Sequence, residues 1–345
     1  MNLRRAVSGC LAVAVVVGLS ACGGAEKAAN VAGDKKITVY SGRSETLVKP
    51  LLEKFQRQSG ITVQVRYGTS AQMAAQLAEE GGRSPADVFF SQDAGALGAV
   101  AKGGNLAALP AEVLSKVPEV YRSRSELWVG VTGRSRVLVY NTDLVPAAEL
   151  PKSVFELTGP AWKGKIGVAP TNGSFQAFVT ALRVQHGDAK AKELLTQLKA
   201  NEPETRDGNV QIVADVNAGK LAAGLVNHYY VYEVAKEQGT TPDKLKAQLH
   251  FFPDGDVGAL VNVAGVGVLK RSATDPDTRA FVDYLLGTEG QTYFAEQTFE
   301  YPLVAGVSAP AGLPALGTLP APRIDLNDLD TLDATIALIK AVGLA

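Results

Sequence analysis

The sequence predicts an α/β fold with two lobes, each a mostly parallel sheet flanked by helices, and a ligand cleft between the lobes. Of the 345 residues, 46% are hydrophobic and 20% are charged, which is ordinary for a globular chain and ample for two cores. Strand-like and helix-like segments alternate along most of the chain, as is typical of parallel sheets covered by helices. No long linker interrupts this alternation, so the two lobes are expected to adjoin directly.

The first lobe begins with three strand–helix units in a row. Short β-rich segments predict strands at 36–40, 61–65 and 87–90. Each strand is followed by a segment with apolar residues at helical spacing, at 45–59, 70–80 and 94–102. Consecutive units of this kind predict a parallel sheet, because each helix returns the chain to the starting end of the next strand.

A second series of elements predicts the second lobe. Strands are expected at 127–131, 136–140, 166–169 and 221–226, and helices at 153–157, 175–186, 189–200, 210–217 and 230–238. Further along, residues 260–269 predict a pair of returning strands, 275–286 and 289–297 paired helices, and 329–342 a closing helix. The proline-rich segment 302–323 is expected to wrap the surface.

The N-terminal residues resemble a bacterial lipoprotein signal. Two arginines precede an apolar stretch over 6–19 that is too short to span a membrane, and the letters LSAC then end at Cys22. The resemblance implies a signal peptide over 1–21 and lipidation of the Cys22 thiol; an ordinary signal peptide with an incidental cysteine is the alternative. The small and polar residues 22–35 predict a flexible tether. The mature protein is therefore expected outside the bacterial cytoplasm, anchored by lipid to the cell membrane.

Charge and cysteine content exclude several functions for the mature chain. The full sequence has a formal net charge of −1 at pH 7, and removal of 1–21 takes away Arg4 and Arg5 and no acid, which leaves −3. This balance offers no basic surplus for nucleic acid. Cys10 leaves with the signal and Cys22 is used by lipid, so neither a disulfide nor a cysteine metal site is expected.

The sequence lacks the motifs of common catalytic sites. It has no G-x-S-x-G elbow, no H-E-x-x-H, no phosphate-binding loop and no dinucleotide fingerprint. The three histidines, His186, His228 and His250, are isolated from one another. Residues 254–256 lack the spaced partners of a calcium loop and predict a turn. The chain is therefore expected to bind a solute and not to be an enzyme.

Small polar residues occupy four junctions at which the chain passes into a helix. These junctions are 41–44, 91–93, 172–174 and 208–209. Ligands of open α/β sheets bind beyond the carboxyl ends of the strands, where helix N-termini offer free N–H groups to an anion. One such junction alone is most often only a helix cap. Four of them, together with Asn227, predict a single cleft between the lobes.

Tyr229 and Tyr230 stand where the predicted strand 221–226 passes into the helix 230–238. Adjacent tyrosines at such a junction can direct two phenol oxygens into one cleft. A phenol has an ordinary pKa of about 10 and becomes a tyrosinate when a strong Lewis-acid cation binds it. Packing of the two rings is the alternative for these residues alone, whereas the polar junctions favour a role as metal ligands.

Six short stretches resemble the periplasmic ferric-ion-binding proteins of bacterial ABC importers. They are ITVYSG at 37–42, SPADVF at 84–89, GRSRVLVY at 133–140, WKGKIG at 162–167, NHYY at 227–230 and EYPL at 300–303. The resemblance implies the type II periplasmic-binding fold, whose two lobes close on a ligand about a hinge. It also implies lobe one at 36–136 plus 260–310 and lobe two at 137–259 plus 311–345.

The same resemblance implies a set of ligands. In that family consecutive tyrosines bind Fe3+ through both phenolate oxygens, which carries over to Tyr229 and Tyr230, and some members add a third tyrosine, for which Tyr140 is the candidate. A synergistic anion, carbonate or phosphate, completes the metal shell in many members. The residues implied to hold this anion belong to the polar junctions: Asn172, Gly173, Ser174, Asn209 and Asn227.

The sequence departs from the family pattern in the first lobe. Many members supply a histidine and a glutamate there, and the matching positions are Ser44 and Gln92. Neither is a strong anionic ligand, so iron would depend on the tyrosines together with an anion or water. Ser44 and Gln92 are then candidates to contact the anion, and Arg43 and Arg136 could hold it through a bidentate contact. His228 is expected to line the site or to be structural.

The resemblance also implies partners. They are a membrane permease and its ATPase, and the protein itself is expected to be a monomer. The main alternative is a related solute-binding protein for an organic ion, such as a phosphonate or thiamine, in which the tyrosines stack on or hydrogen-bond the solute. A lipid-anchored scaffold without a solute is a third class, and the polar junctions argue against it.

Overall fold

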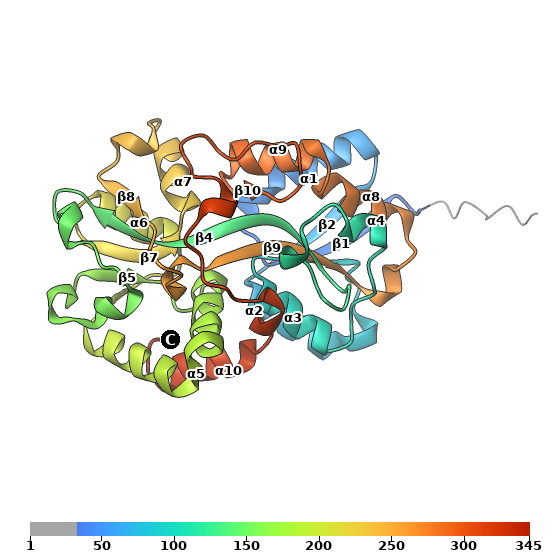
Figure 1. The fold of residues 1–345 in the computed structure, drawn as a ribbon. Helices are drawn as coiled ribbons and strands as arrows, with labels where there is room; N and C mark the ends of the chain where they lie inside the picture. The colour runs from blue at the N-terminus through green and yellow to red at the C-terminus, as the bar shows by residue number, and fades with distance from the viewer. Residues whose placement is uncertain (1–32) are drawn as a thin grey trace, which may run out of the picture. The chain divides into compact units, whose positions relative to one another are not determined.

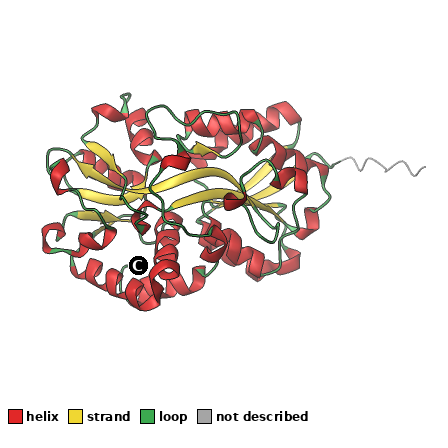
Figure 2. Cartoon of the chain, viewed as in Figure 1, coloured by secondary structure: helices red, strands yellow, loops and turns green. Residues whose placement is uncertain are grey.

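A central sheet of ten strands runs through residues 33–345, which are the residues that the computed structural model describes. Helices cover both faces of this sheet (Figure 1; Figure 2). The strand order is β2-β1-β3-β9-β4-β7-β5-β6, with β8 and β10 pairing with β4 at its sides. The described residues form one compact unit. The α/β fold class is therefore confirmed.

The two outer parts of the sheet are parallel. At one end β1 (Lys36–Ser41) pairs with β2 (Thr62–Tyr67) and with β3 (Val88–Ser91). At the other end β5 (Ile166–Val168) pairs with β6 (Glu204–Thr205) and β7 (Ala223–Asn227). These are the strands that helices connect, as the alternating pattern predicts.

The middle of the sheet is antiparallel, so the expectation of a mostly parallel sheet holds only for the outer strands. β4 (Val129–Asn141) pairs with β9 (Val261–Val268) up to Ser135, and with β7 from Arg136 onward. The change of partner between these two residues joins the two parts of the sheet. β8 (Ala247–His250) and β10 (Tyr301–Pro302) also run antiparallel to β4.

Two strand predictions are wrong at this centre. The sequence predicted strands at 127–131 and 136–140 with a break between them, but β4 is one continuous strand because β9 and β10 bond the intervening residues. Residues 260–269 predicted two strands and form only β9. Gly265 lets β9 approach β4 closely, since a Cβ atom there would lie 2.6 Å from the carbonyl oxygen of Val129.

The helices agree more closely with the sequence pattern. They are α1 (Glu45–Ser59), α2 (Ser70–Glu80), α3 (Ala94–Lys102), α4 (Ala111–Leu114), α5 (Gly173–Ala200), α6 (Asn209–Asn217), α7 (Tyr229–Glu237), α8 (Pro276–Leu285), α9 (Thr288–Gln297) and α10 (Leu332–Ala341). Inside α5, Gly187 has φ 81° and ψ 161°, which breaks the helix into the two helices that were predicted.

The C-terminal segment contacts helices of both parts of the fold. A short 3-10 turn at Leu326–Leu329 packs on α3, and α10 packs on α5 (Figure 1). Gly98 of α3 makes this contact possible, because a Cβ atom there would lie 2.7 Å from the Cβ of Asp330. The assignment of 311–345 to lobe two alone does not describe these contacts, and the other lobe boundaries stay predictions.

The predictions for the N-terminus fall largely outside the described residues. The signal peptide at 1–21, Cys22 and the tether up to 32 are among the residues that are not described. At the end of the expected tether, the backbone N–H of Lys35 donates to Asp277 Oδ2 at 2.6 Å, which holds the chain against α8. Within residues 33–345, no helix is both long and apolar enough to cross a membrane.

Candidate functional site

Tyr229 and Tyr230 begin α7, directly after β7 ends at Asn227. Their ring centroids lie 4.2 Å apart with the planes tilted by 34°, and the residues are 1% and 7% exposed. Burial, followed by the neighbouring Tyr230, raises the pKa of Tyr229 well above its ordinary value. The Tyr229 phenol therefore stays protonated at neutral pH until a cation replaces the proton.

His228 connects the tyrosine pair to two other segments. Its Nδ1 accepts a hydrogen bond from the Ser135 backbone N–H at 3.2 Å, and its Nε2 donates to the Phe299 carbonyl at 2.9 Å. The side chain is fully buried, and burial lowers its pKa to about 4. His228 is therefore neutral at pH 7, and both ring nitrogens are used by the backbone.

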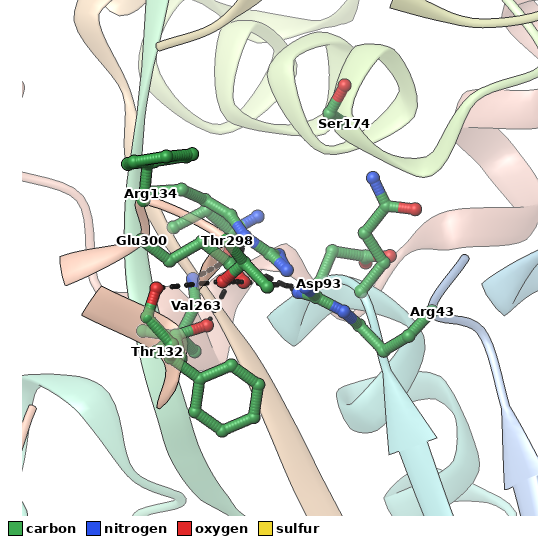
Figure 3. Close-up of polar contacts among 12 residues, drawn as sticks. Arg43, Asp93, Thr132, Arg134, Ser174, Val263, Thr298 and Glu300 are labelled. Atoms are coloured by element: carbon green, nitrogen blue, oxygen red, sulfur yellow. Dashed lines mark hydrogen bonds and ion pairs between the residues drawn. The ribbon is translucent and has the colours of Figure 1, made fainter. Parts of the chain in front are cut away.

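Arg43 and Arg134 share one buried carboxylate, that of Glu300 (Figure 3). Arg43 makes a bidentate contact, with Nη1 2.8 Å from Oε1 and Nη2 2.6 Å from Oε2. Arg134 donates from Nε to Oε1 at 3.0 Å. Burial opposes ionisation of Glu300, but the charges of Arg43 and Arg134 hold its pKa well below the usual range. The expectation that the Arg43 fork holds a solute anion is thus not met, because Glu300 occupies it.

Arg136 has no such carboxylate. Its Nη1 donates to Ser174 Oγ at 3.0 Å and its Nη2 to the Leu225 carbonyl at 2.9 Å, while the buried Nε has no partner among the described residues. The guanidinium carbon lies 5.6 Å from the ring centroids of both Phe175 and Phe178. Burial lowers the pKa of Arg136 to about 9. A buried cation left in this state is costly, which favours an anion beside it.

Asn172, Ser174 and Asn209 come together from two of the polar junctions. Asn172 Oδ1 caps α5 and accepts hydrogen bonds from the Ser174 N–H at 3.0 Å, the Ser174 hydroxyl at 2.8 Å and Asn209 Nδ2 at 3.3 Å. Asn209 Nδ2 also lies 3.1 Å from Ser174 Oγ, whereas its Oδ1 is buried without a partner among residues 33–345. This cluster aligns Ser174, which in turn orients Arg136.

A narrow cavity of about 10 Å³, close to the space that one water molecule needs, lies between these groups. Its lining brings together residues from the junction between β3 and α3, from β4, β7 and α5, and from the start of β9: Gln92, Asp93, Arg134, Arg136, Ser174, Asn227, Leu260 and Asn262. Two of the predicted anion contacts, Gln92 and Asn227, are therefore beside Arg136. A larger cavity, of about 770 Å³, lies along β1 and β2, where Tyr40 already donates to Glu80, and we do not assign the site there.

The first turns of α3 and α5 meet at this cavity. Asp93 caps α3, with its Oδ1 accepting from the Ala96 N–H at 2.8 Å. Its Oδ2 faces Gly173, where an added Cβ atom would lie only 3.0 Å away. Burial raises the pKa of Asp93 to about 6. Because Gly173 has no side chain, the starts of the two helices can approach each other closely.

Two predicted residues are not brought to this place. Tyr140 pairs with Ala223, whereas Arg136 pairs with Asn227, so Tyr140 lies about 13 Å further along β4, at the opposite end of β7. We therefore remove Tyr140 from the candidate ligands. Ser44 is exposed and its Oγ lies 2.8 Å from Thr46 Oγ1, so it contacts its own helix.

Sequence reasoning missed Glu300 and Arg134 as parts of the site, and it included Asp93 only as a member of the polar junction 91–93. Glu300 and Arg134 each lie in a stretch that supported the family resemblance, but nothing in the sequence pairs them across 166 residues. Among residues 33–345, no cluster of three or more His, Cys, Asp or Glu side chains could hold a metal.

Comparisons with known proteins agree with this architecture. Residues 83–331 match the family model described as bacterial extracellular solute-binding protein. The chain is 33% identical to the Fe(3+)-binding periplasmic protein of Serratia marcescens, over 90% of this chain and 91% of the relative. It is 34% identical to the major ferric iron-binding protein of Neisseria meningitidis serogroup B, over 89% of this chain and 93% of the relative.

Solved structures show the same similarity in three dimensions. Iron-bound HitA from Pseudomonas aeruginosa is 35% identical with a TM-score of 0.84, covering 89% of this chain and 99% of that one. IdiA (FutA) from Trichodesmium, in complex with iron and citrate ligands, is 30% identical with a TM-score of 0.74, covering 90% and 100%. These relatives are solute-binding proteins, which confirms that the chain is not an enzyme. The chain belongs to the bacterial extracellular solute-binding protein family, in the branch whose members are named for ferric iron.

Proposed function

We propose that this protein binds ferric iron through the phenolate oxygens of Tyr229 and Tyr230, together with an anion beside Arg136. The relatives named for ferric iron support the cation. The observation that carries the proposal is the joint burial of two adjacent tyrosines and an arginine that lacks a carboxylate partner among the described residues. Both features leave the site incomplete until a cation and an anion are present.

Iron binding would replace the phenol protons. Burial keeps the pKa of Tyr229 high, so the ring becomes a tyrosinate only when a strong Lewis acid stabilises its charge. Ferric iron is such a cation and suits hard oxygen donors. Because Ser44 and Gln92 offer no negative charge, the two tyrosines carry more of the coordination than in relatives that supply a histidine and a glutamate.

The anion is proposed to be carbonate or phosphate. Its binding groups would be the unpaired Nε of Arg136, the unpaired Nη2 of Arg134 and the neighbouring amides of Gln92 and Asn227. Charged N–H donors of this kind form strong hydrogen bonds to oxyanions. The relative that binds iron with citrate makes a carboxylate chelator a further form in which iron could arrive.

Transport would follow from closure of two lobes on the loaded site. Lobe one is proposed at 36–136 plus 260–310 and lobe two at 137–259 plus the C-terminal segment. The closed monomer would dock on a membrane permease that a cytoplasmic ATPase drives. The lipidated Cys22 and the tether would keep the protein at the outer surface of the bacterial cell membrane.

The decisive experiment uses the colour of iron–tyrosinate complexes. Protein loaded with ferric ion and bicarbonate is expected to show a visible charge-transfer band, and Tyr229→Phe or Tyr230→Phe should abolish or strongly weaken it. Each substitution should weaken ferric binding by roughly a hundredfold or more, which is about 2.7 kcal/mol. Tyr140→Phe is the matched control and should retain the band. If the wild-type protein neither develops the band nor keeps iron through desalting, the proposal is wrong.

A phosphonate is the second candidate solute. The unpaired nitrogens of Arg134 and Arg136 favour an anionic solute, and they disfavour a cation such as thiamine. Calorimetry with methylphosphonate in iron-free buffer separates the two functions. Tight binding that survives the double substitution of Tyr229 and Tyr230 to Phe would favour the phosphonate over iron.

A further inference from the structure

Glu300 is a buried carboxylate that touches two site arginines and has no acceptor left for a solute. Its two oxygens accept five hydrogen bonds, of which Arg43 gives two and Arg134 one. Thr132 donates the fourth at 3.0 Å and Thr298 the fifth at 2.9 Å. A carboxylate offers about four lone-pair positions, so Glu300 is saturated. Figure 3 shows this carboxylate between the two guanidinium groups, away from Ser174 on α5.

The backbone around Glu300 is held on both sides, so the carboxylate has a defined position. Phe299 adopts φ 57°, a left-handed conformation that is uncommon for a residue with a side chain. Its carbonyl accepts the hydrogen bond from His228, and its ring lies 5.1 Å from that of Tyr232. On the other side, Tyr301 pairs with Gly133 in the sheet. Contacts with α7 on one side and β4 on the other therefore fix the position of the Glu300 carboxylate.

The three buried arginines of the site carry more positive charge than the carboxylates of Glu300 and Asp93 together neutralise. Arg43, Arg134 and Arg136 are each at most 2% exposed, and Glu300 is the carboxylate to which two of them bond. Within the part of the chain that the structure describes, one buried nitrogen of each arginine has no hydrogen-bond partner: Arg43 Nε, Arg134 Nη2 and Arg136 Nε. Of these three arginines, only Arg134 and Arg136 line the narrow cavity.

We propose that Glu300 is a positioning residue that acts as an internal counter-anion, an inference that rests on the proposed function of the site. Glu300 binds both Nη atoms of Arg43 and the Nε of Arg134. In the cavity, the solute anion can therefore bind only Arg134 Nη2 and Arg136 Nε, which have no partner among the described residues. Glu300 thereby limits how tightly the site holds its anion. A carrier benefits from this limit, because it must release the anion together with its cargo.

Iron-free protein and inorganic phosphate test this role without depending on iron. Glu300→Gln keeps the shape of the side chain and removes its charge, which frees Arg134 for the anion. Calorimetry should then show phosphate binding about tenfold tighter than in the wild-type protein. Glu300→Asp keeps the charge and should leave phosphate affinity close to that of the wild type. Glu119→Gln, at an exposed ion pair, is the surface control and should change nothing.

Two double substitutions with equal net charge separate positioning from folding. E300Q/R43Q removes the bidentate pair and frees Arg134, so phosphate should bind more tightly than in the wild type. E300Q/R134Q removes Arg134, one of the two arginines that line the cavity, so this gain should be absent. Both double variants have the same net charge as the wild-type protein. They can therefore be compared with each other even if the single Glu300→Gln variant fails to fold.

Two outcomes overturn the proposal. One is equal phosphate affinity in the wild type and in every folded variant, which would leave Glu300 with a purely structural role. The other is equal affinity in the two double variants, which would show that freeing Arg134 has no effect. Absence of the iron–tyrosinate band in the wild-type protein would instead contradict the proposed function, while the phosphate series would still report on Glu300.

Discussion

Arg136 and Glu300 show two different results of burying a charge. Glu300 receives five hydrogen bonds and two positive neighbours, so its ionised form is favoured despite full burial. Arg136 receives only neutral partners, and its pKa falls to about 9. Buried charges are expected to be paired. Arg136 is therefore the group beside which we propose the solute anion, whereas Glu300 is already fully hydrogen-bonded within the protein.

Asp93 provides a prediction about stability and pH. Burial raises its pKa in the folded protein to about 6, from an ordinary value of 3.8. The folded state thus binds the proton more tightly than the unfolded state, and the charged carboxylate reduces stability increasingly as the pH rises from about 4 to 6. Asp93→Asn keeps a good helix cap and removes this charge. The gain in unfolding free energy over the wild type should therefore grow to roughly 3 kcal/mol at pH 7.

Urea unfolding of both proteins at pH 4 and pH 7 measures this difference. The variant and the wild type should be close at pH 4, where Asp93 is protonated in the folded wild-type protein. A gain of equal size at both pH values would mean that the charge of Asp93 is not the cause.

At the scale of elements, β4 and the C-terminal segment connect the two parts of the fold. β4 changes partner from β9 to β7 between Ser135 and Arg136, and His228 bonds the backbone of Ser135 at this point. The C-terminal segment makes a second connection, because its 3-10 turn packs on α3 and α10 packs on α5. The starts of α3 and α5 line the site, so this segment helps to set their separation.

The contact between α5 and α10 can be tested at Thr335. Its hydroxyl lies 2.7 Å from that of Thr180 in a buried position, and Arg183 Nη1 donates to it at 2.9 Å. Thr335→Val should lower the unfolding free energy by roughly 1–3 kcal/mol, because it removes the two buried hydrogen bonds of this hydroxyl, to Thr180 and to Arg183. The measurement is urea unfolding, with circular dichroism as the readout.

A double substitution serves as the control for this contact. When both hydroxyls are replaced, in T180V/T335V, the loss should be smaller than the sum of the two single losses, since each single loss already includes the hydrogen bond that the two threonines share. Strictly additive losses would mean that the two threonines do not interact in solution.

At the scale of the whole molecule, the starts of α3 and α5 lie close together. Asp93 and Gly173 are close enough that a Cβ atom at Gly173 would touch the carboxylate, and the cavity beside them is narrow. A solute larger than one water molecule can enter only if the starts of α3 and α5 separate. The protein is therefore expected to open in the absence of solute and to close on it.

Small-angle scattering tests this motion. The radius of gyration of the wild-type protein should fall when ferric ion and bicarbonate are added to iron-free protein. The double variant Y229F/Y230F should show no change, because it lacks the ligands that hold the lobes together. An unchanged radius in the wild type, with the charge-transfer band present, would show that loading does not require closure.

The sequence was sufficient for local features of the site. The strand-to-helix position of Tyr229 and Tyr230 followed from patterns within a few residues, and so did the polar junctions that supply Asn172, Ser174 and Asn209. The prediction of Tyr140 as a metal ligand was not supported, because the position of a strand residue relative to the site depends on how the strands pair. The predicted break in β4 failed for a similar reason: polar residues of 132–135 are held in a strand by partners distant in sequence.

The sequence by itself determined the α/β class, the resemblance to ferric-ion-binding proteins and the tyrosine pair, because periodicity and short motifs are local properties of the chain. Only the tertiary structure decided which charges are satisfied. Glu300 lies 257 residues from Arg43 and 166 from Arg134, and their contact means that Arg43, a candidate anion ligand, pairs with a carboxylate of the protein itself. Among the described residues, Arg136 makes no ion pair, because its hydrogen bonds go to the neutral groups of Ser174 and Leu225 and aromatic rings pack beside it. Such pairing depends on distances between remote segments, which the order of residues does not specify.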